Sequence, residues 1–221
     1  MTEIYKLPES YNIPQLTDET FRGVVDWAKN MTIELNRIFV DNNNKINNHT
    51  WKLIHIADIA TAVNDYTISN INGDADKTYM IICRFRNSFN GAVDYVLKPN
   101  NTASGSNAYG TQYVTGDGTN ATTTQVTDAT GMAVGYVSAQ NDMCHCNGIL
   151  FAKSGVVRTF NASMVDDVNA STIGYSTLKH SVWNDTSTVI TSLKFYAYQN
   201  GGSDVAANGI GIGSYIELWS K

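Results

Sequence analysis

Charged residues are scarce in this 221-residue sequence, at 16% of the total, against about a quarter in ordinary globular domains. Its 15 Lys and Arg residues are scattered and the formal net charge is −5. We therefore expect no nucleic-acid partner, because phosphate binding needs a basic stripe. No run of about 18 apolar residues occurs, which predicts that no segment spans a membrane. The first residues lack the pattern of a secretion signal, so we expect cytosolic synthesis.

Cysteines are few and odd in number, which argues against a disulfide framework. In Cys144-His145-Cys146 neighbouring side chains of a strand would point to opposite faces, and the spacing is not Cys-x-x-Cys. Further zinc ligands would have to come from Cys83 or His180. We expect buried or half-buried thiols, with no metal site and no cofactor.

Catalytic constellations are also lacking. No nucleophile with a base and no carboxylate pair for glycoside hydrolysis is recognisable. The run Asn72-Gly73-Asp74-Ala75-Asp76 resembles the start of a calcium loop, but the downstream acidic ligand is missing, so a plain turn is predicted. We expect that the protein is not an enzyme.

What the sequence does contain is much Asn, Thr, Ser and Gly, which is typical of strands and turns rather than of helix surfaces. Short apolar or alternating runs separated by turn residues predict strands at 51–59, 78–86, 92–98, 109–114, 132–139, 147–153, 156–161, 173–183, 189–198 and 212–219. The stretch 100–130 has little to bury and predicts a long excursion or weak hairpin. The fold class expected for residues 49–221 is mainly β, an antiparallel, jelly-roll-like β-sandwich.

The first 48 residues differ from the rest. Residues 1–17 contain two prolines and show no periodicity, which predicts an extended segment that lies along a partner surface. Residues 18–48 predict a single α-helix, because apolar residues recur at steps of three and four. This seam consists of Phe21, Val24, Ala28, Met31, Leu35 and Ile38. It either packs on the chain's own sandwich or associates with copies of itself as a stalk.

Aromatic residues in loop-rich contexts are candidates for ligand binding, since aromatic rings beside amide and hydroxyl groups are the usual means of holding sugars. The candidates are Tyr109, Tyr113, Tyr136, Tyr175 and Trp183. Packing in the core or on a strand face is the alternative for each of them.

Four stretches of the second part resemble a β-sandwich module of phage head and tail fibre proteins: Tyr95–Asn101, Gly148–Thr159, Ser181–Thr186 with Ile190–Leu193, and Gly213–Trp219. The resemblance covers about residues 51–221 and implies a virion subunit. It further implies a homo-oligomer, often a trimer, whose residues 1–17 dock on a capsid, collar or tail protein and whose sandwich faces a host-surface glycan. The brevity of the chain favours a short head fibre, capsid decoration or collar subunit. A free carbohydrate-binding module remains the alternative.

Overall fold

The structure is a computed structural model that describes residues 30–35, 37, 38, 50–102, 108–116, 121–127, 130–168, 174–200 and 204–221. The chain divides into two compact units, Met1–Thr50 and Trp51–Lys221. In the first unit, residues 30–35, 37 and 38 are helical, within the range predicted for the helix.

Three members of the predicted seam fall on described residues. Met31 is half-buried, whereas Leu35 is 54% exposed and Ile38 is 43% exposed. Phe21, Val24 and Ala28 lie outside the described residues, as does the predicted docking segment 1–17.

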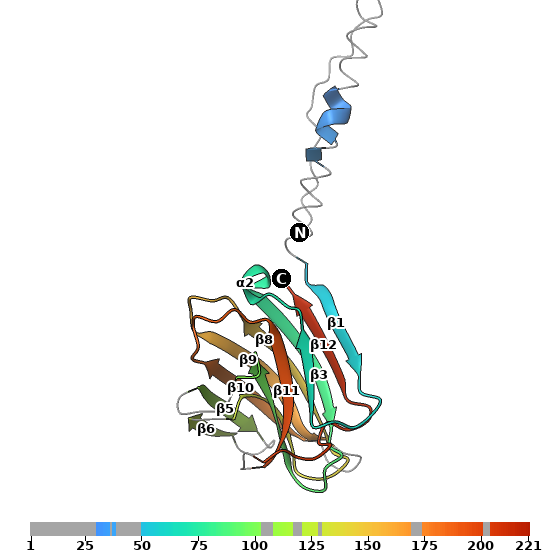
Figure 1. The fold of residues 1–221 in the computed structure, drawn as a ribbon, viewed down its shortest axis with the longest axis vertical. Helices are drawn as coiled ribbons and strands as arrows, with labels where there is room; N and C mark the ends of the chain where they lie inside the picture. Colours follow the sequence, from blue (N-terminus) through green and yellow to red (C-terminus); the bar gives the residue numbers. More distant parts are fainter. Residues whose placement is uncertain are drawn as a thin grey trace, which may run out of the picture. The chain divides into compact units, whose positions relative to one another are not determined.

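The second unit contains two antiparallel β-sheets (Figure 1). From edge to edge, the large sheet consists of β1 (Lys52–Asp58), β12 (Tyr215–Ser220), β3 (Thr78–Arg86), β8 (Met143–Phe151), β9 (Arg158–Val168), β10 (Tyr175–Trp183), β5 (Tyr109–Gly116) and β6 (Ala121–Thr127). The small sheet consists of β2 (Asp65–Ser69), β11 (Ser192–Gln199), β4 (Val93–Pro99) and β7 (Met132–Val137). The predicted antiparallel β-sandwich is confirmed. Its described strands divide unequally, eight and four, so the large sheet extends beyond what a simple eight-stranded jelly roll would contain.

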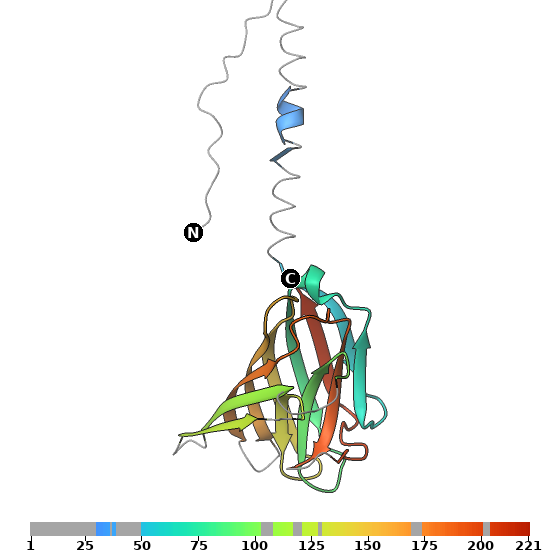
Figure 2. The same ribbon diagram turned by 60° about the vertical axis from the view of Figure 1, so that its left-hand side comes forward.

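Each of the ten predicted strands overlaps an observed one, and two further strands, β2 and β6, were not predicted. Within the stretch 100–130, β5 and β6 pair without interruption from Gly110 opposite Thr127 to Gly116 opposite Ala121. The hairpin interpretation of that stretch is therefore confirmed. Figure 2 shows this hairpin reaching out from the body of the sandwich.

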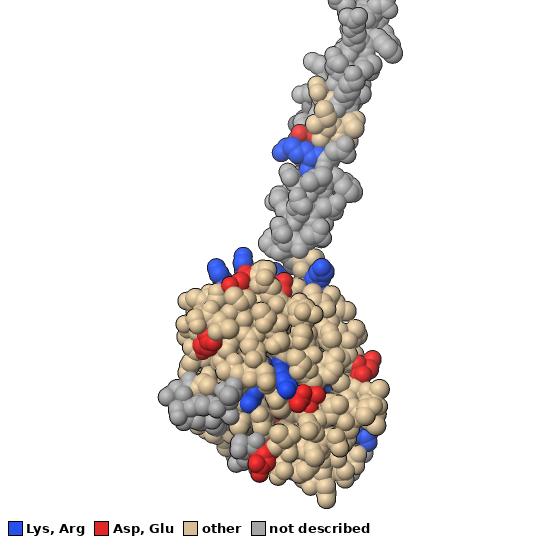
Figure 3. Space-filling view, viewed as in Figure 1, with Lys and Arg blue, Asp and Glu red and all other residues tan. Residues whose placement is uncertain are grey.

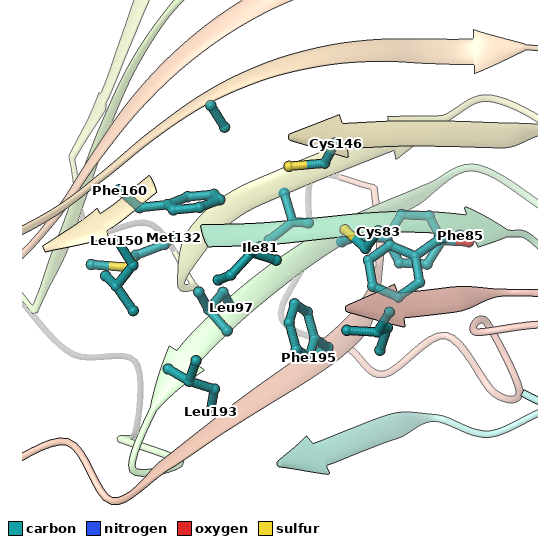
Figure 4. Close-up of a cluster of buried hydrophobic side chains, with 14 of the residues drawn as sticks. Ile81, Cys83, Phe85, Leu97, Met132, Cys146, Leu150, Phe160, Leu193 and Phe195 are labelled. Carbon is teal, nitrogen blue, oxygen red and sulfur yellow. The ribbon is translucent and has the colours of Figure 1, made fainter. Parts of the chain in front are cut away.

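The core lies between the two sheets and is built largely by alternation of inward and outward side chains along the strands. In β3, for example, Tyr79, Ile81, Cys83 and Phe85 point inward and are at most 2% exposed. Phe85 stacks on Tyr95 of the opposite sheet with ring centroids 4.7 Å apart. Figure 4 shows Phe85 within this buried cluster, together with Phe195 of the small sheet. Burial of such aromatic side chains is the main apolar contribution to holding two sheets together.

The segment predicted as a plain turn forms a short helix, α2 (Gly73–Asp76). Asn72 is its N-cap, and its Oδ1 accepts hydrogen bonds from the backbone N–H groups of Asp74 and Ala75 at 3.1 and 3.2 Å. Asp74 accepts hydrogen bonds from the backbone N–H and the hydroxyl of Ser154 at 2.6 and 2.8 Å. These bonds hold the pKa of Asp74 below its usual value. The carboxylate thus fastens α2 to the turn after β8.

The edge of the small sheet at β7 is closed by side chains of the large sheet. The backbone N–H of Ala133 donates to Ser181 Oγ at 3.1 Å, and that of Tyr136 donates to Asp166 Oδ1 at 2.9 Å. Both acceptors are buried, at 0% and 4% exposed. Asp166 also lies 3.6 Å from the Lys179 ammonium. We call this arrangement, Ser181 with Asp166, the β7 cap.

A buried arginine holds the connection between β10 and β11. Arg158 is fully buried, and its guanidinium donates to the backbone carbonyls of Asp185 and Thr188. Its guanidinium carbon lies 5.1 Å from the centre of the Trp183 ring, a cation–π distance. Hydrogen bonds from Thr188 and Ser187 keep the pKa of Asp185 far below its usual range. These contacts give Arg158 and Trp183 structural roles in the fold.

Candidate functional site

A groove of about 790 Å³ lies on the face of the large sheet that is turned away from the small sheet, across β9, β10, β5 and β6. We call this the outer face and this hollow the groove. Its lining consists of Gln112, Tyr113, Val114, Thr123, Thr124, Gln125, Asn161, Ala162, Ser163, Leu178, Lys179 and His180. The volume falls in the range of small-molecule and cofactor sites.

Strand register assembles the lining into two rows. Gln125, Gln112, His180 and Asn161 are direct neighbours across four strands. Residues directly opposite one another on a sheet face have Cβ atoms about 5 Å apart. The first row therefore presents amide and imidazole groups side by side.

The second row is apolar in its centre. Val114 lies opposite Leu178, with Thr123 and Ser163 at either end. Leu178 is 61% exposed and Val114 is 43% exposed. Two exposed aliphatic side chains flanked by hydroxyls form a floor suited to a ligand with both apolar and hydroxylated faces.

His180 is oriented by its neighbour on β9. Its Nδ1 is hydrogen-bonded to Asn161 Oδ1, and because an amide oxygen only accepts, Nδ1 is the donor. Within the described part of the chain, Nε2 makes no hydrogen bond. The imidazole thus has one nitrogen fixed by the protein and one available to a ligand.

The groove is close to neutral. Among the described residues, no carboxylate lines it. Lys179 contributes to the lining, but its ammonium lies 5.9 Å from the Tyr113 ring and 3.6 Å from Asp166, a residue of the inner face. Binding here would depend on hydrogen bonds and apolar contact rather than on ion pairs, and the acid and base of a hydrolase are missing from the described lining.

The structure does not gather the predicted aromatic residues into one platform. Tyr109 and Trp183 are each 1% exposed and lie opposite each other in the core, so their expected role in ligand contact is wrong: alternation turns both rings inward. Tyr113 is half-buried on the same inner face of β5. Tyr136 is half-buried on β7, and Tyr175 is 44% exposed at the start of β10.

Tyr113 is the one predicted aromatic residue that also contributes to the groove lining. The exposed polar residues of the groove were missed because they alternate with the aromatic residues that the sequence pointed to. Gln112 alternates with Tyr113 along β5, and His180 shares β10 with Trp183. The exposed polar side of these two strands was the available signal. It is weak, because any solvent-facing strand shows it.

The cysteines behave as the alternation predicts. Cys83, Cys144 and Cys146 are buried, Cys83 lies opposite Cys146, and His145 points to the outer face. Burial raises the pKa of the Cys83 and Cys144 thiols, which keeps them protonated and unreactive. In the described part of the chain, no group of three or more His, Cys, Asp or Glu residues is placed to hold a metal ion.

A second cluster of aromatic and basic side chains lies on the outward side of the small sheet. Tyr196 and Tyr198 stack at 5.5 Å, and the Lys98 ammonium donates to the Tyr198 hydroxyl at 2.8 Å. Burial lowers the pKa of Lys98. Lys194 lies 3.4 Å from Asp65. These groups satisfy one another, and Lys98 and Tyr198 are only 5% and 7% exposed, so the cluster offers less to a ligand than the groove does.

Charged side chains are sparse on the face of the molecule shown in Figure 3, where the Lys and Arg residues form no continuous stripe. No helix among the described residues is long and apolar enough to cross a membrane. No protein-family model, no curated protein and no solved structure matches this chain.

Proposed function

We propose that this chain is a homo-oligomeric structural subunit of a phage-type virion whose sandwich binds a neutral glycan in the groove. The observation that carries the binding part is the lining, in which amide, hydroxyl and imidazole groups surround the apolar pair Val114 and Leu178. Sugar hydroxyls require paired donors and acceptors, and their apolar faces pack on apolar side chains. A near-neutral groove favours an uncharged glycan over an anionic one.

The protein in this proposal binds its glycan without cleaving it. Glycoside hydrolysis requires two carboxyl groups about 5 to 9 Å apart on either side of the scissile bond. None lines the groove among the described residues. Incubation with a bound oligosaccharide should therefore leave it intact, as measured by chromatography of reducing ends, and release of sugars would contradict this part of the proposal.

The virion role is supported by the resemblance of residues 51–221 to fibre modules and by a helical segment that precedes the sandwich. Residues 1–17 would dock on a capsid, collar or tail protein, in a short head fibre, a capsid decoration or a collar or tail fibre. A free carbohydrate-binding module is the alternative, and it would use the same groove. Immunogold labelling of intact particles separates the two, since only a virion subunit labels a fixed position on the particle.

Glycan binding is tested with the double variant Gln112→Ala/His180→Ala. Removing two adjacent hydrogen-bonding groups should weaken binding at least about tenfold, since one net hydrogen bond contributes about 1 kcal/mol. The readout is a glycan array followed by calorimetric titration of the best ligand. Ser176→Ala is the matched control, because Ser176 is exposed on the outer side of β10 but does not line the groove. An equal loss of glycan affinity in the control, or an unchanged affinity in the double variant, would refute the proposed binding site.

Oligomerisation through the seam is tested by light scattering of Leu35→Asp and Arg37→Asp. A charge placed in an apolar seam costs several kcal/mol, roughly 2–5, so Leu35→Asp should dissociate the expected trimer. Arg37 is exposed and pairs with the exposed Glu34 at 2.5 Å, and exposed pairs contribute little. A monomeric wild type at micromolar concentration, or a trimeric Leu35→Asp variant, would end the stalk hypothesis.

A further inference from the structure

Four of the described strands lie at sheet edges: β1 and β6 end the large sheet, and β2 and β7 end the small one. An edge strand carries a row of backbone N–H and C=O groups without a ladder partner, which can pair with another chain. Soluble proteins suppress such pairing with charges, bulges, short edge strands or covering side chains. The four edges differ in how many of these devices they have.

Three edges are protected. At β7, the cap of Ser181 and Asp166 occupies two backbone N–H groups, and the pairing with β4 has a bulge. At β1, Lys52 and Asp58 place charges at both ends and a bulge interrupts the pairing with β12. At β2, the strand has five residues and Asp65 forms an ion pair with Lys194.

Within the part of the chain that the structure describes, the fourth edge, β6, has none of these devices. Its seven residues, Ala-Thr-Thr-Thr-Gln-Val-Thr, include no charge and no proline. Its pairing with β5 runs from end to end without a bulge. Residues 122–125 are exposed. Thr and Val have high β-propensity, so this strand is pre-formed for pairing along its open side.

We infer that β6 pairs in antiparallel orientation with β6 of a second copy of this chain. About a two-fold axis at Thr124, Thr124 meets its own counterpart and Thr123 meets Gln125. Every such pair is uncharged, so no like charges oppose one another, and Thr–Thr neighbours are favourable cross-strand pairs. Taken by itself, a two-fold contact of this kind is closed and does not grow into fibres.

Pairing at β6 would join two large sheets into one continuous sheet. It would also bring two grooves together, because Thr123 and Gln125 of β6 line each groove. Two linked sites bind a multivalent surface more tightly than either site alone. The pairing itself is independent of the glycan proposal and of the helical seam, which lies in the other unit of the chain.

The test is disulfide cross-linking of the full chain carrying Thr124→Cys. Directly opposite residues of an antiparallel pair have Cα atoms about 4.5–5.5 Å apart, within disulfide range. The native cysteines are at most 3% exposed, so they do not compete. Thr67→Cys is the matched control, an exposed Thr on the edge strand β2. It reports any cross-linking caused merely by stalk association.

Under mild oxidation, Thr124→Cys should form covalent dimers about tenfold faster or more than Thr67→Cys, because pairing gives the thiols a high effective concentration. If the two-fold axis lies one residue away, at position 123 or 125, Thr123→Cys or Gln125→Cys places the two opposed thiols on it. In addition, Thr124→Lys and Thr124→Asp should each lose the association, and an equimolar mixture should regain it. If all three cysteine variants cross-link no faster than the control, or link only to a different protein, the inference is overturned, whatever the outcome of the glycan experiments.

Discussion

The edge strands β7 and β6 belong to the same sandwich but end their sheets in opposite ways. At β7, buried side chains from β9 and β10 take up the backbone N–H groups of Ala133 and Tyr136. At β6, the open side faces no described side chain that hydrogen-bonds to it, and the strand itself is neutral and unbroken. The first edge is therefore a matter of folding stability, and the second is a matter of association.

The difference follows from where each strand lies. β7 packs over β8, β9 and β10, so an unpaired backbone group there would be buried, and a buried unsatisfied group costs about 1–3 kcal/mol. β6 projects beyond the small sheet (Figure 2), where water can satisfy its backbone. The backbone of the first edge must therefore be satisfied within the fold, whereas that of the second is left open to a partner.

The largest effect is expected from Asp166→Ala, which removes the acceptor for Tyr136 N–H and leaves the Lys179 ammonium, whose side chain is 10% exposed, without its carboxylate. We expect the free energy of unfolding to fall by about 3 kcal/mol, measured by urea denaturation. Asp204→Ala, at an exposed loop residue, should change it by no more than about 0.5 kcal/mol. A loss below about 1 kcal/mol at Asp166 would show that the β7 cap is not what secures that edge.

A smaller loss is expected from Ser181→Ala. Its hydroxyl accepts from Ala133 N–H at 3.1 Å and bonds to Thr111 Oγ1 at 3.0 Å, fully buried. Both partners would lose a buried hydrogen bond, so we expect about 1–2 kcal/mol of destabilisation. Ser176→Ala on the exposed side of the same strand is the control and should be neutral. Equal effects at both positions would remove the distinction between the two faces of β10.

Hydrogen exchange measures the same contrast at individual amides. The N–H groups of Ala133 and Tyr136 should exchange slowly in the wild type and about tenfold faster in the corresponding cap variant. In β6, amides facing β5 should be protected at every protein concentration. Those facing the open side should become protected only as concentration rises, because their partner is a second copy. Protection of all β6 amides in dilute solution would contradict this.

The smallest effect on stability is expected from Thr124→Lys. The residue is exposed and buries nothing in the single chain, so the free energy of unfolding of the dilute protein should change by no more than about 0.5 kcal/mol. Pairing through β6 should nevertheless be lost, because two ammonium groups would face each other across the pair. Unfolding monitored at low and high protein concentration separates the stability of the single chain from the contribution of pairing between chains. A destabilised dilute variant would mean that β6 contributes to the fold of one chain.

The sequence predicts the sandwich well because core strands carry an apolar face. Tyr79, Ile81, Cys83 and Phe85 alternate with outward residues, and that period is visible without a structure. β6 is foreseen only as part of a weak hairpin, without bounds of its own, for the converse reason. Its sequence of Thr, Gln, one Ala and one Val has no apolar face, and its place in the sheet is set by backbone pairing with β5, which leaves no period to detect.

The groove was beyond sequence reasoning for a related reason. Gln112, Asn161 and His180 come from three strands, and only register puts them in one row. Register depends on turns and on partners distant in the chain, and local composition does not encode it. Tyr109 and Trp183 have side chains suited to sugar binding, but their positions in the alternation of their strands turn both side chains into the core.

The pairing of β1 with β12 would determine how the sandwich responds to force if the chain is anchored through its first unit, as the proposed function has it. Trp51 leads into the sandwich through β1, and β1 pairs with β12 from Lys52 opposite Ser220 to Asp58 opposite Tyr215. The hydrogen bonds of an antiparallel pair are perpendicular to its strands, so tension applied along β1 would shear them all together instead of peeling them one by one. The bulge between Leu53 and His55 is the first irregularity that such a force would meet, and it is where a pulled domain should begin to yield.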